Sequence, residues 1–141
     1  MPVQVKHVSW KQGRKQLKAL RTKVFICEYH IPPSVEFDKA DYEAHHILLL
    51  DIDETPVATA RIANNGRISR VAIATHHRNQ AINTQLIDAI KALAVKLGLA
   101  RVSFNCELTD INKFAQPRYQ RTGGVFMEAG IPRQTLACDT D

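Results

Sequence analysis

The sequence predicts a mixed α/β domain, and three features of the chain support this fold class. First, 141 residues suffice for one domain that buries about two thirds of its unfolded surface. Second, three short strand-like segments joined by turn residues occupy the first half. Third, residues 70–106 read as an apolar strand, an amphipathic helix and another strand. Because no internal repeat, linker or low-complexity stretch interrupts the chain, we expect residues 1–141 to form one domain.

The first two elements are a half-buried strand and a helix. Residues 3–8 alternate apolar and polar side chains, which is typical of such a strand. Ser9 can cap a helix that reaches about Glu28, because its hydroxyl can accept from an early backbone N–H. The side chains predicted for the inner helix face are Leu17, Leu20, Val24 and Phe25. The prolines at 32–33 cannot donate to a helical ladder and end this element, and an acidic connection over residues 36–43 follows.

Three strands of an antiparallel meander come next. They are predicted over residues 46–50, 57–62 and 67–73. A polar turn over residues 51–56 joins the first two strands. Between the second and third strands stands Asn64-Asn65-Gly66, a strong hairpin signal because Asn and Gly tolerate positive φ.

The most regular helix of the sequence follows the third meander strand. Apolar side chains recur on one helical face at Ile82, Leu86, Ile90, Leu93 and Leu97. Gly98 stands just past this series, where a left-handed residue closes a helix at least cost. A strand that feeds a helix through a tight turn leaves unpaired N–H groups at the helix start. We therefore expect an anion site there, and phosphate is the usual ligand of such a site.

The remaining elements complete the sheet. Residues 101–106 form a strand after a crossover helix, so this strand should run parallel to the one before that helix. Thr109 can cap a short helix that reaches about Ala115. The last predicted pair of strands covers residues 119–127 and 134–138.

The charge balance favours an anionic ligand without identifying one, because the net charge is +5 at pH 7. The first helix carries a group of basic side chains: Lys11, Arg14, Lys15, Lys18, Arg21 and Lys23. These form either a solvated helix face or a nucleic-acid surface. No motif of a nucleic-acid-binding fold accompanies them, so we expect no nucleic-acid partner.

Composition also bears on compartment and metals. Cys27, Cys106 and Cys138 lie far apart, which argues against a disulfide framework or zinc ribbon and favours a reducing cytoplasm. No apolar run approaches the roughly 18 residues of a membrane span, and the first ten residues lack an export signal's apolar core. The adjacent histidines at 45–46 and at 76–77 would point to opposite faces of a strand, so we expect no metal site.

Four segments occur in a specific order along nearly the whole chain. They are LRTKVFICEYHIPPSVEFDKADYEAHH (residues 20–46), VATARI (57–62), RVAIATHHR (70–78) and FMEAGIP (126–132). In this order and spacing the chain resembles the GNAT N-acetyltransferase superfamily, specifically a branch of small bacterial single-domain members. The resemblance implies a GNAT-like fold, with a mostly antiparallel central sheet that splays between its fourth and fifth strands and is flanked by helices.

The resemblance also implies acetyl-CoA as the acyl donor, without a metal. Backbone groups of Val71, Ala72 and Ile73 would bind the pantetheine arm. Backbone amides of the following turn would hold the pyrophosphate, and the residues concerned are Arg78, Asn79, Gln80, Ala81, Ile82, Asn83 and Thr84.

This turn departs from the family's pattern of Arg/Gln-x-x-Gly-x-Gly/Ala. It reads Arg-Asn-Gln-Ala-Ile-Asn from Arg78 and has lost every glycine. Glycine lets a diphosphate approach the backbone and permits positive φ, whereas Asn is the other residue that best tolerates left-handed geometry. The side-chain amide of Asn83 would either occupy phosphate space or donate to a phosphate oxygen.

The candidate acid and bases also follow from the resemblance and from charge. Lys113 and Phe114 stand where the family has Phe-Tyr, so the usual tyrosine acid is missing and Phe114 is expected beside the coenzyme. Tyr119 is then either a replacement acid or a packed aromatic. Glu36 belongs to an acidic cluster that either draws an amine and accepts its proton or is a solvated turn. Glu107 ends a central strand, either as a base with a raised pKa or in a salt bridge to an arginine.

The resulting functional prediction is an N-acetyltransferase that moves an acetyl or longer acyl group to a primary amine of a small molecule or peptide. The first alternative is a catalytically impaired protein of the same fold, acting as a CoA-binding sensor or a protein-interaction scaffold. A nucleic-acid binder is the second alternative and rests on the basic helix alone. A strand at the sheet's edge could also pair two copies into a homodimer.

Overall fold

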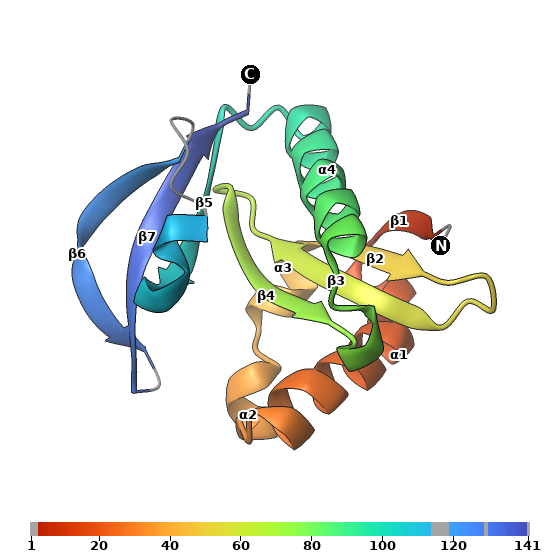
Figure 1. The fold of residues 1–141 in the computed structure, drawn as a ribbon. Coiled ribbons are helices and arrows are strands. Elements are labelled where there is room, and N and C mark those ends of the chain that lie inside the picture. The colour runs from red at the N-terminus through yellow and green to blue at the C-terminus, as the bar shows by residue number, and fades with distance from the viewer. Residues whose placement is uncertain (1–2, 114–118, 129, 141) are drawn as a thin grey trace.

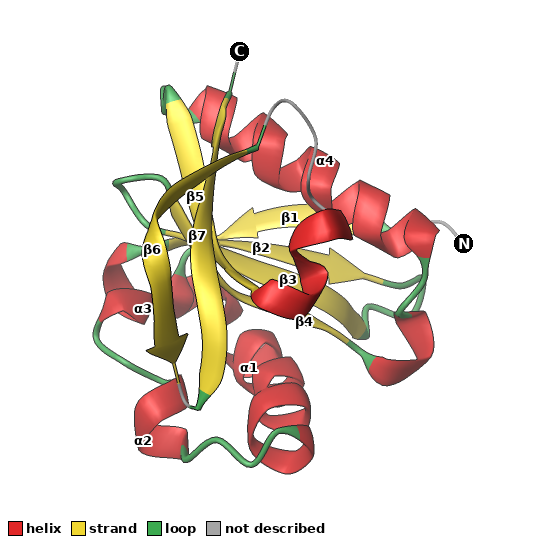
Figure 2. Cartoon of the chain, turned by 60° about the vertical axis from the view of Figure 1, so that its left-hand side comes forward, coloured by secondary structure: helices red, strands yellow, loops and turns green. Residues whose placement is uncertain are grey.

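The structure is a computed structural model, and it describes residues 3–113, 119–128 and 130–140. Seven strands form one sheet in the order β1-β2-β3-β4-β5-β7-β6. Helix α4 covers one face of the half-sheet made by β1 to β4, and α1 covers the other face (Figures 1 and 2). Every neighbouring pair of strands is antiparallel except β4 and β5, which are parallel. The predicted mixed α/β class is therefore confirmed.

The predicted first strand and helix are present, with one difference at the end of the helix. Strand β1 (Gln4–Val8) leads into α1 (Trp10–Arg21), and Ser9 and Gln12 cap it with reciprocal side-chain bonds. From Thr22 to Glu28 the helix continues as a π-helical segment, η1. The wider turn is held where the Tyr29 N–H donates to the Val24 carbonyl, five residues back, at 3.1 Å.

The predicted meander is confirmed, and the acidic connection before it is more ordered than expected. Two short helices, α2 (Pro33–Glu36) and α3 (Ala40–Glu43), interrupt that connection. Strands β2 (His45–Leu50), β3 (Pro56–Ile62) and β4 (Arg67–Ile73) then pair in antiparallel order. Their bounds differ from those predicted by one residue or none.

One extra residue interrupts the pairing of β3 with β4. Thr59 faces Ala72 and Arg61 faces Ser69, so β4 uses three steps where β3 uses two. The bulge places Arg70 at φ +52°, a left-handed conformation that an arginine adopts only at a cost of about 1–3 kcal/mol. The bulge therefore needs other contacts to hold it.

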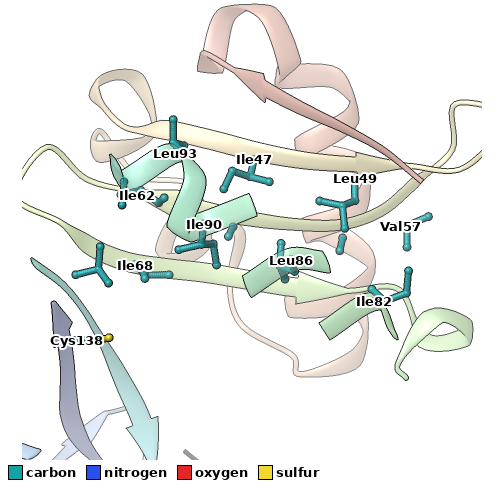
Figure 3. Close-up of a cluster of buried hydrophobic side chains, with 14 residues drawn as sticks. Ile47, Leu49, Val57, Ile62, Ile68, Ile82, Leu86, Ile90, Leu93 and Cys138 are labelled. Carbon is teal, nitrogen blue, oxygen red and sulfur yellow. The ribbon is translucent and has the colours of Figure 1, made fainter. Parts of the chain in front are cut away.

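The long helix α4 (Gln80–Lys96) packs its predicted apolar face on the sheet. Ile82, Leu86, Ile90 and Leu93 are buried against apolar side chains of β2, β3 and β4, as Figure 3 shows. Gly98 follows the helix with φ +73°, as predicted. Among the described residues, no helix is long and apolar enough to cross a membrane.

Strands β4 and β5 (Arg101–Glu107) meet at one end and then diverge (Figure 1). Their register contains two pairs, Arg67 with Ser103 and Ile68 with Phe104. Gly66 fixes this end, because its φ is +88° and an added Cβ would lie 2.3 Å from the Arg101 carbonyl oxygen. The predicted splay is thus confirmed, and beyond Ile68 the β4 edge has no partner on β5.

The C-terminal elements complete the second half of the sheet. After β5 the predicted short helix is present as a 3₁₀ segment, η3 (Leu108–Lys113). Strands β6 (Gln120–Glu128) and β7 (Ile131–Asp139) form a hairpin, and β7 lies between β5 and β6. Strand β6 is consequently an edge of the sheet.

Candidate functional site

The end of β4 presents backbone that β5 does not pair. Ala72 and Ile73 have partners on β3, whereas the register with β5 stops at Ile68. A strand edge of this kind offers N–H and C=O groups to an extended ligand. One of these groups is engaged, because the Ile73 carbonyl accepts from Arg78 Nε at 3.0 Å. The residues predicted to bind an extended arm, Val71 to Ile73, therefore lie along the strand edge that the splay leaves open.

Immediately after β4, a short 3₁₀ turn, η2 (Thr75–His77), leads to the start of α4. Asn79 is the N-cap residue: its side-chain oxygen accepts from the Ile82 N–H at 2.9 Å. The Asn79 carbonyl accepts from the Asn83 N–H at 3.1 Å, and the Asn79 N–H donates to the His77 carbonyl at 3.0 Å. Three of the seven predicted anion-binding amides are thus already used within the chain, and helix geometry also gives the Thr84 N–H an acceptor, the Gln80 carbonyl.

The amides of Gln80 and Ala81 differ from these three. They are the first two of α4, and helix geometry gives them no acceptor within the helix. Both residues are exposed, and the first turn of α4 contains no acidic side chain to oppose an anion. The arrangement can bind a phosphate-like anion through two main-chain donors and the helix dipole.

Arg78, also predicted in the anion site, is tied to η1. Its two terminal nitrogens donate to the two carboxylate oxygens of Glu28, each at 2.6 Å. Hydrogen bonds from Arg78 hold the pKa of Glu28 below its usual value, and the same bonds raise the pKa of Arg78. The pair therefore stays fully charged at neutral pH.

Glu36, predicted as a catalytic base, lies in a buried network of charges. Its side chain is 2% exposed, with Arg21 Nε 2.6 Å and Arg70 Nε 3.3 Å away. Arg21 also donates to Asp41 at 2.8 Å. Burial raises the pKa of Glu36 although Arg21 and Arg70 both oppose this rise. Glu36 is therefore not part of a solvated turn, and its carboxylate is paired with Arg21 and Arg70 rather than open to an amine.

Two further arginines extend the network to the sheet. Arg61 donates to Asp38 at 2.7 Å and to Asp41 at 3.1 Å. Arg70 approaches Asp38 within 3.2 Å and donates to the Glu36 carbonyl at 3.0 Å. These contacts tie the acidic connection to β3 and to the β4 bulge, and they supply the support that the left-handed Arg70 needs.

The network includes one buried histidine, His46 on β2. Its Nε2 lies 2.9 Å from the Asp41 carbonyl oxygen, so the neutral ring carries its proton there and donates it. His46 packs beneath the acidic connection. Burial lowers the pKa of His46 below its usual value.

This shift predicts a pH-dependent stability. In the unfolded chain His46 takes up a proton near pH 6.5, whereas in the folded chain its pKa is lower. The contribution of neutral His46 to the free energy of unfolding is therefore fully present above pH 6.5 and decreases as pH falls toward the lowered pKa. The slope contributed by His46 is at most about 1.4 kcal/mol per pH unit. Urea unfolding at pH 7.5, 6.5 and 5.5 should show a shallower loss for His46→Gln than for the wild type. Equal slopes would contradict this prediction, and His76→Gln, at an exposed position, serves as the control.

The other predicted catalytic residues lie in the second half of the sheet. Glu107 ends β5 with its side chain 41% exposed, and its carboxylate is 3.7 Å from Arg133, so of the two alternatives the ion pair is present. Tyr119 packs edge-on against Phe104, with ring centroids 6.0 Å apart. Phe114 lies outside the described residues.

In the described parts of the chain, no group of three or more side chains is arranged to hold a metal ion.

Sequence reasoning missed Arg21 and Glu28 as members of these clusters. It placed Arg21 in an exposed basic group, either a solvated face or a nucleic-acid surface, and this is wrong for Arg21 because its side chain is buried. A signal was present, since Arg21 lies four residues after Leu17 and one after Leu20, on the predicted inner face. For Glu28 the sequence offers no comparable signal, because its partner is 50 residues away.

Comparison with known proteins supplies evidence on family and fold that does not depend on the geometry of the site. Residues 14–124 match the family model described as the "Acetyltransferase (GNAT) family". The chain is 24% identical over 135 residues to YjcF of Bacillus subtilis, named an uncharacterised N-acetyltransferase, covering 91% of this chain and 96% of YjcF. Among solved structures, a Lactobacillus plantarum protein named for a proposed N-acetyltransferase activity has a TM-score of 0.87 at 24% identity, with 99% of both chains covered. An acyl-CoA N-acyltransferase from Pseudomonas aeruginosa has a TM-score of 0.82 at 23% identity, covering 97% of this chain and 98% of that one.

Proposed function

This chain belongs to the acetyltransferase (GNAT) family, and we propose that it transfers an acetyl or longer acyl group from acyl-CoA to a primary amine. The observation that carries the proposal is the continuity between two backbone surfaces. The unpaired end of β4 leads through one short turn to the exposed start of α4. An extended pantetheine arm followed by a diphosphate matches this succession of strand edge and helix start. The acyl-CoA substrate in the name of the Pseudomonas aeruginosa relative supports the same donor.

Donor binding would use main-chain groups on both surfaces. The amides of Gln80 and Ala81 would donate to the diphosphate, where hydrogen bonds to a charged acceptor contribute about 1.5–3 kcal/mol each. Backbone groups from Val71 to Ile73 would bind the pantetheine arm. This donor set needs no glycine, because Gln80 and Ala81 already face solvent.

The transfer itself would be a direct attack of the amine nitrogen on the thioester carbonyl carbon. A main-chain N–H near Ile73 would stabilise the oxyanion that forms. The carboxylate of Glu107 is paired with Arg133 but remains partly exposed, and through water it would accept the proton that the amine releases. The C–S bond then breaks, and the thiolate takes a proton from water or from Tyr119, so the products are the amide and free CoA.

Two measurements test this function. CoA should raise the melting temperature of the protein, because a ligand that binds only the folded state stabilises it by mass action. Acetyl-CoA incubated with the protein and a panel of primary amines should release free thiol faster than without protein. Failure of CoA to shift the melting temperature, together with no thiol release for any amine, would refute the proposal.

A specific feature favours the alternative of a CoA-binding protein without transferase activity. The sequence has Phe114 where the resemblance places the tyrosine acid, so the group that would protonate the leaving thiolate is missing. The pair of substitutions Phe114→Tyr and Asn83→Gly discriminates between the two functions. Thiol release gained by this variant indicates a weakened enzyme, whereas CoA binding with unchanged absence of release indicates a binder.

Removing the competing cap should strengthen donor binding. In Asn79→Gly the Ile82 N–H loses its side-chain acceptor and becomes available to the diphosphate. Asn79 has φ −138° and ψ 170°, which glycine also adopts, and a glycine N-cap costs only about 0.3 kcal/mol. We expect CoA to bind about three-fold more tightly by titration calorimetry. Asn79→Ser, which keeps a capping oxygen, should show no gain, and a similar gain in both variants would contradict this explanation.

A further inference from the structure

We propose that Glu28 is a positioning residue for coenzyme binding: it holds the guanidinium of Arg78 across the end of β4 and thereby fixes the turn that presents the Gln80 and Ala81 amides. The inference rests on the proposed function, because it concerns the site that would take the coenzyme's diphosphate. Glu28 itself need not touch the coenzyme.

The contacts of Arg78 show how the turn is held. Nε donates to the Ile73 carbonyl at 3.0 Å, and the terminal nitrogens donate to both oxygens of Glu28 at 2.6 Å. A guanidinium carries five N–H groups, so three are engaged here and one remains on each terminal nitrogen. Asn79, the next residue, caps α4. The backbone that leads into the helix is thus anchored through one side chain to both β4 and η1.

Glu28 belongs to η1, a segment that packs against the same end of β4. It is the last residue of η1, whose wide turns are closed by the Tyr29 and Ile31 N–H groups. Leu20 and Val24 pack with Ala72 of β4 in one apolar cluster. Because π-helical segments are uncommon and occur often at functional sites, the placement of a charged residue at this end of η1 is informative.

Because the Glu28–Arg78 pair is partly exposed, we expect it to orient the turn but to add little to the stability of the fold. Each side chain is 35% exposed, and ion pairs at that exposure add little to folding stability. Two-point contact between a guanidinium and a carboxylate nevertheless restricts the position of both groups. The other described bonds between Thr75 and the start of α4 are local, among them those from His77 to the Ala74 carbonyl and from Asn79 to the His77 carbonyl. The nearest bond to another strand comes before the turn, from the Ala74 N–H to the Val57 carbonyl at 2.8 Å. Loss of the pair should therefore loosen the turn without unfolding the protein.

Simple charge arithmetic makes the opposite prediction, which gives the proposal a sharp test. Glu28→Gln removes a negative charge beside a site for an anion, so electrostatics alone would tighten coenzyme binding. If Glu28 acts by positioning Arg78, the same substitution weakens binding, because the neutral amide cannot hold both terminal nitrogens. The sign of the change distinguishes the two effects.

The experiment measures CoA affinity by titration calorimetry for the wild type, Glu28→Gln, Arg78→Gln and the double variant. We expect Glu28→Gln to weaken CoA binding about five-fold, to raise the KM for acetyl-CoA without changing kcat, and to move the melting temperature by less than about 2 °C. In the Arg78→Gln background the Glu28→Gln change should have no further effect, since its partner is already gone. Glu28→Asp should recover part of the affinity because it restores the charge.

Glu43→Gln provides the matched control, because it removes the same charge from an exposed residue of α3. It should leave CoA affinity unchanged. Unchanged or tighter CoA binding by Glu28→Gln, or an equal loss in the presence and absence of Arg78, overturns the positioning role and leaves the proposed function standing. If the wild type itself binds no CoA, the proposed function fails, and the positioning role fails with it.

Discussion

Arg21→Met should be among the most destabilising single substitutions in this protein. The change leaves Glu36 and Asp41 buried without the guanidinium that pairs with both of them. Breaking a buried ion pair from one side costs about 3–5 kcal/mol, which is a large part of the 5–15 kcal/mol that keeps a domain folded. Urea unfolding at pH 7.5 should show this loss. Arg61 and Arg70 still contact the two carboxylates, so the lower end of the range is expected.

The pH dependence of that loss identifies its cause. Without Arg21, burial raises the pKa of the two carboxyl groups above their unfolded values, so the variant gains stability as pH falls and these groups take up protons. The difference between wild type and Arg21→Met should therefore shrink between pH 7.5 and 5. Lys15→Met, on the exposed face of the same helix, should change stability by less than about 0.5 kcal/mol. A comparable loss in both variants would contradict a specific role of the buried pair.

These two substitutions also show where sequence reasoning succeeds and where it fails. Periodicity predicted α1, α4 and the strands because a buried face repeats at fixed local spacing. The same periodicity puts Arg21 on the inner helix face, but it could not show how the buried charge is compensated, because the partner groups lie 15 and 20 residues away. A charged side chain on a helix looks the same in sequence whether water or a buried carboxylate receives it.

The same limit applies at the candidate site. The hairpin residues around Gly66 predicted the β3–β4 turn, and the crossover order predicted the parallel pair β4 and β5, because both follow from local turn chemistry and chain connectivity. The splay of that pair was implied by the resemblance to the GNAT family. Whether the Ile82 N–H remains available at the start of α4 depends instead on a single side-chain rotamer. Asn79 turns its oxygen onto the Ile82 N–H and so removes one predicted donor. The sequence contains the residue but not the orientation of its side chain.

A proline at position 80 should remove one anion donor while leaving the helix intact. Gln80 is the first residue of α4, where proline's fixed φ suits the helix and its missing N–H breaks no helical bond. The preceding residue must be extended, and Asn79 already is, with φ −138° and ψ 170°. If the Gln80 N–H donates to the diphosphate, Gln80→Pro should weaken CoA binding about ten-fold or more, as expected for one hydrogen bond to a charged group.

Gln80→Ala isolates the backbone from the side chain, since it keeps the N–H and removes the amide group. Calorimetry should show CoA affinity close to that of the wild type for Gln80→Ala, and the far-ultraviolet circular dichroism spectra of both variants should match the wild-type spectrum. Equal weakening by alanine and proline would assign the contact to the glutamine side chain, and unchanged affinity in Gln80→Pro would remove this amide from the site. The two variants differ in the backbone N–H at position 80, which alanine keeps and proline lacks. A ten-fold difference in CoA affinity between them would therefore show that this N–H, exposed although the turn has no glycine, binds the coenzyme.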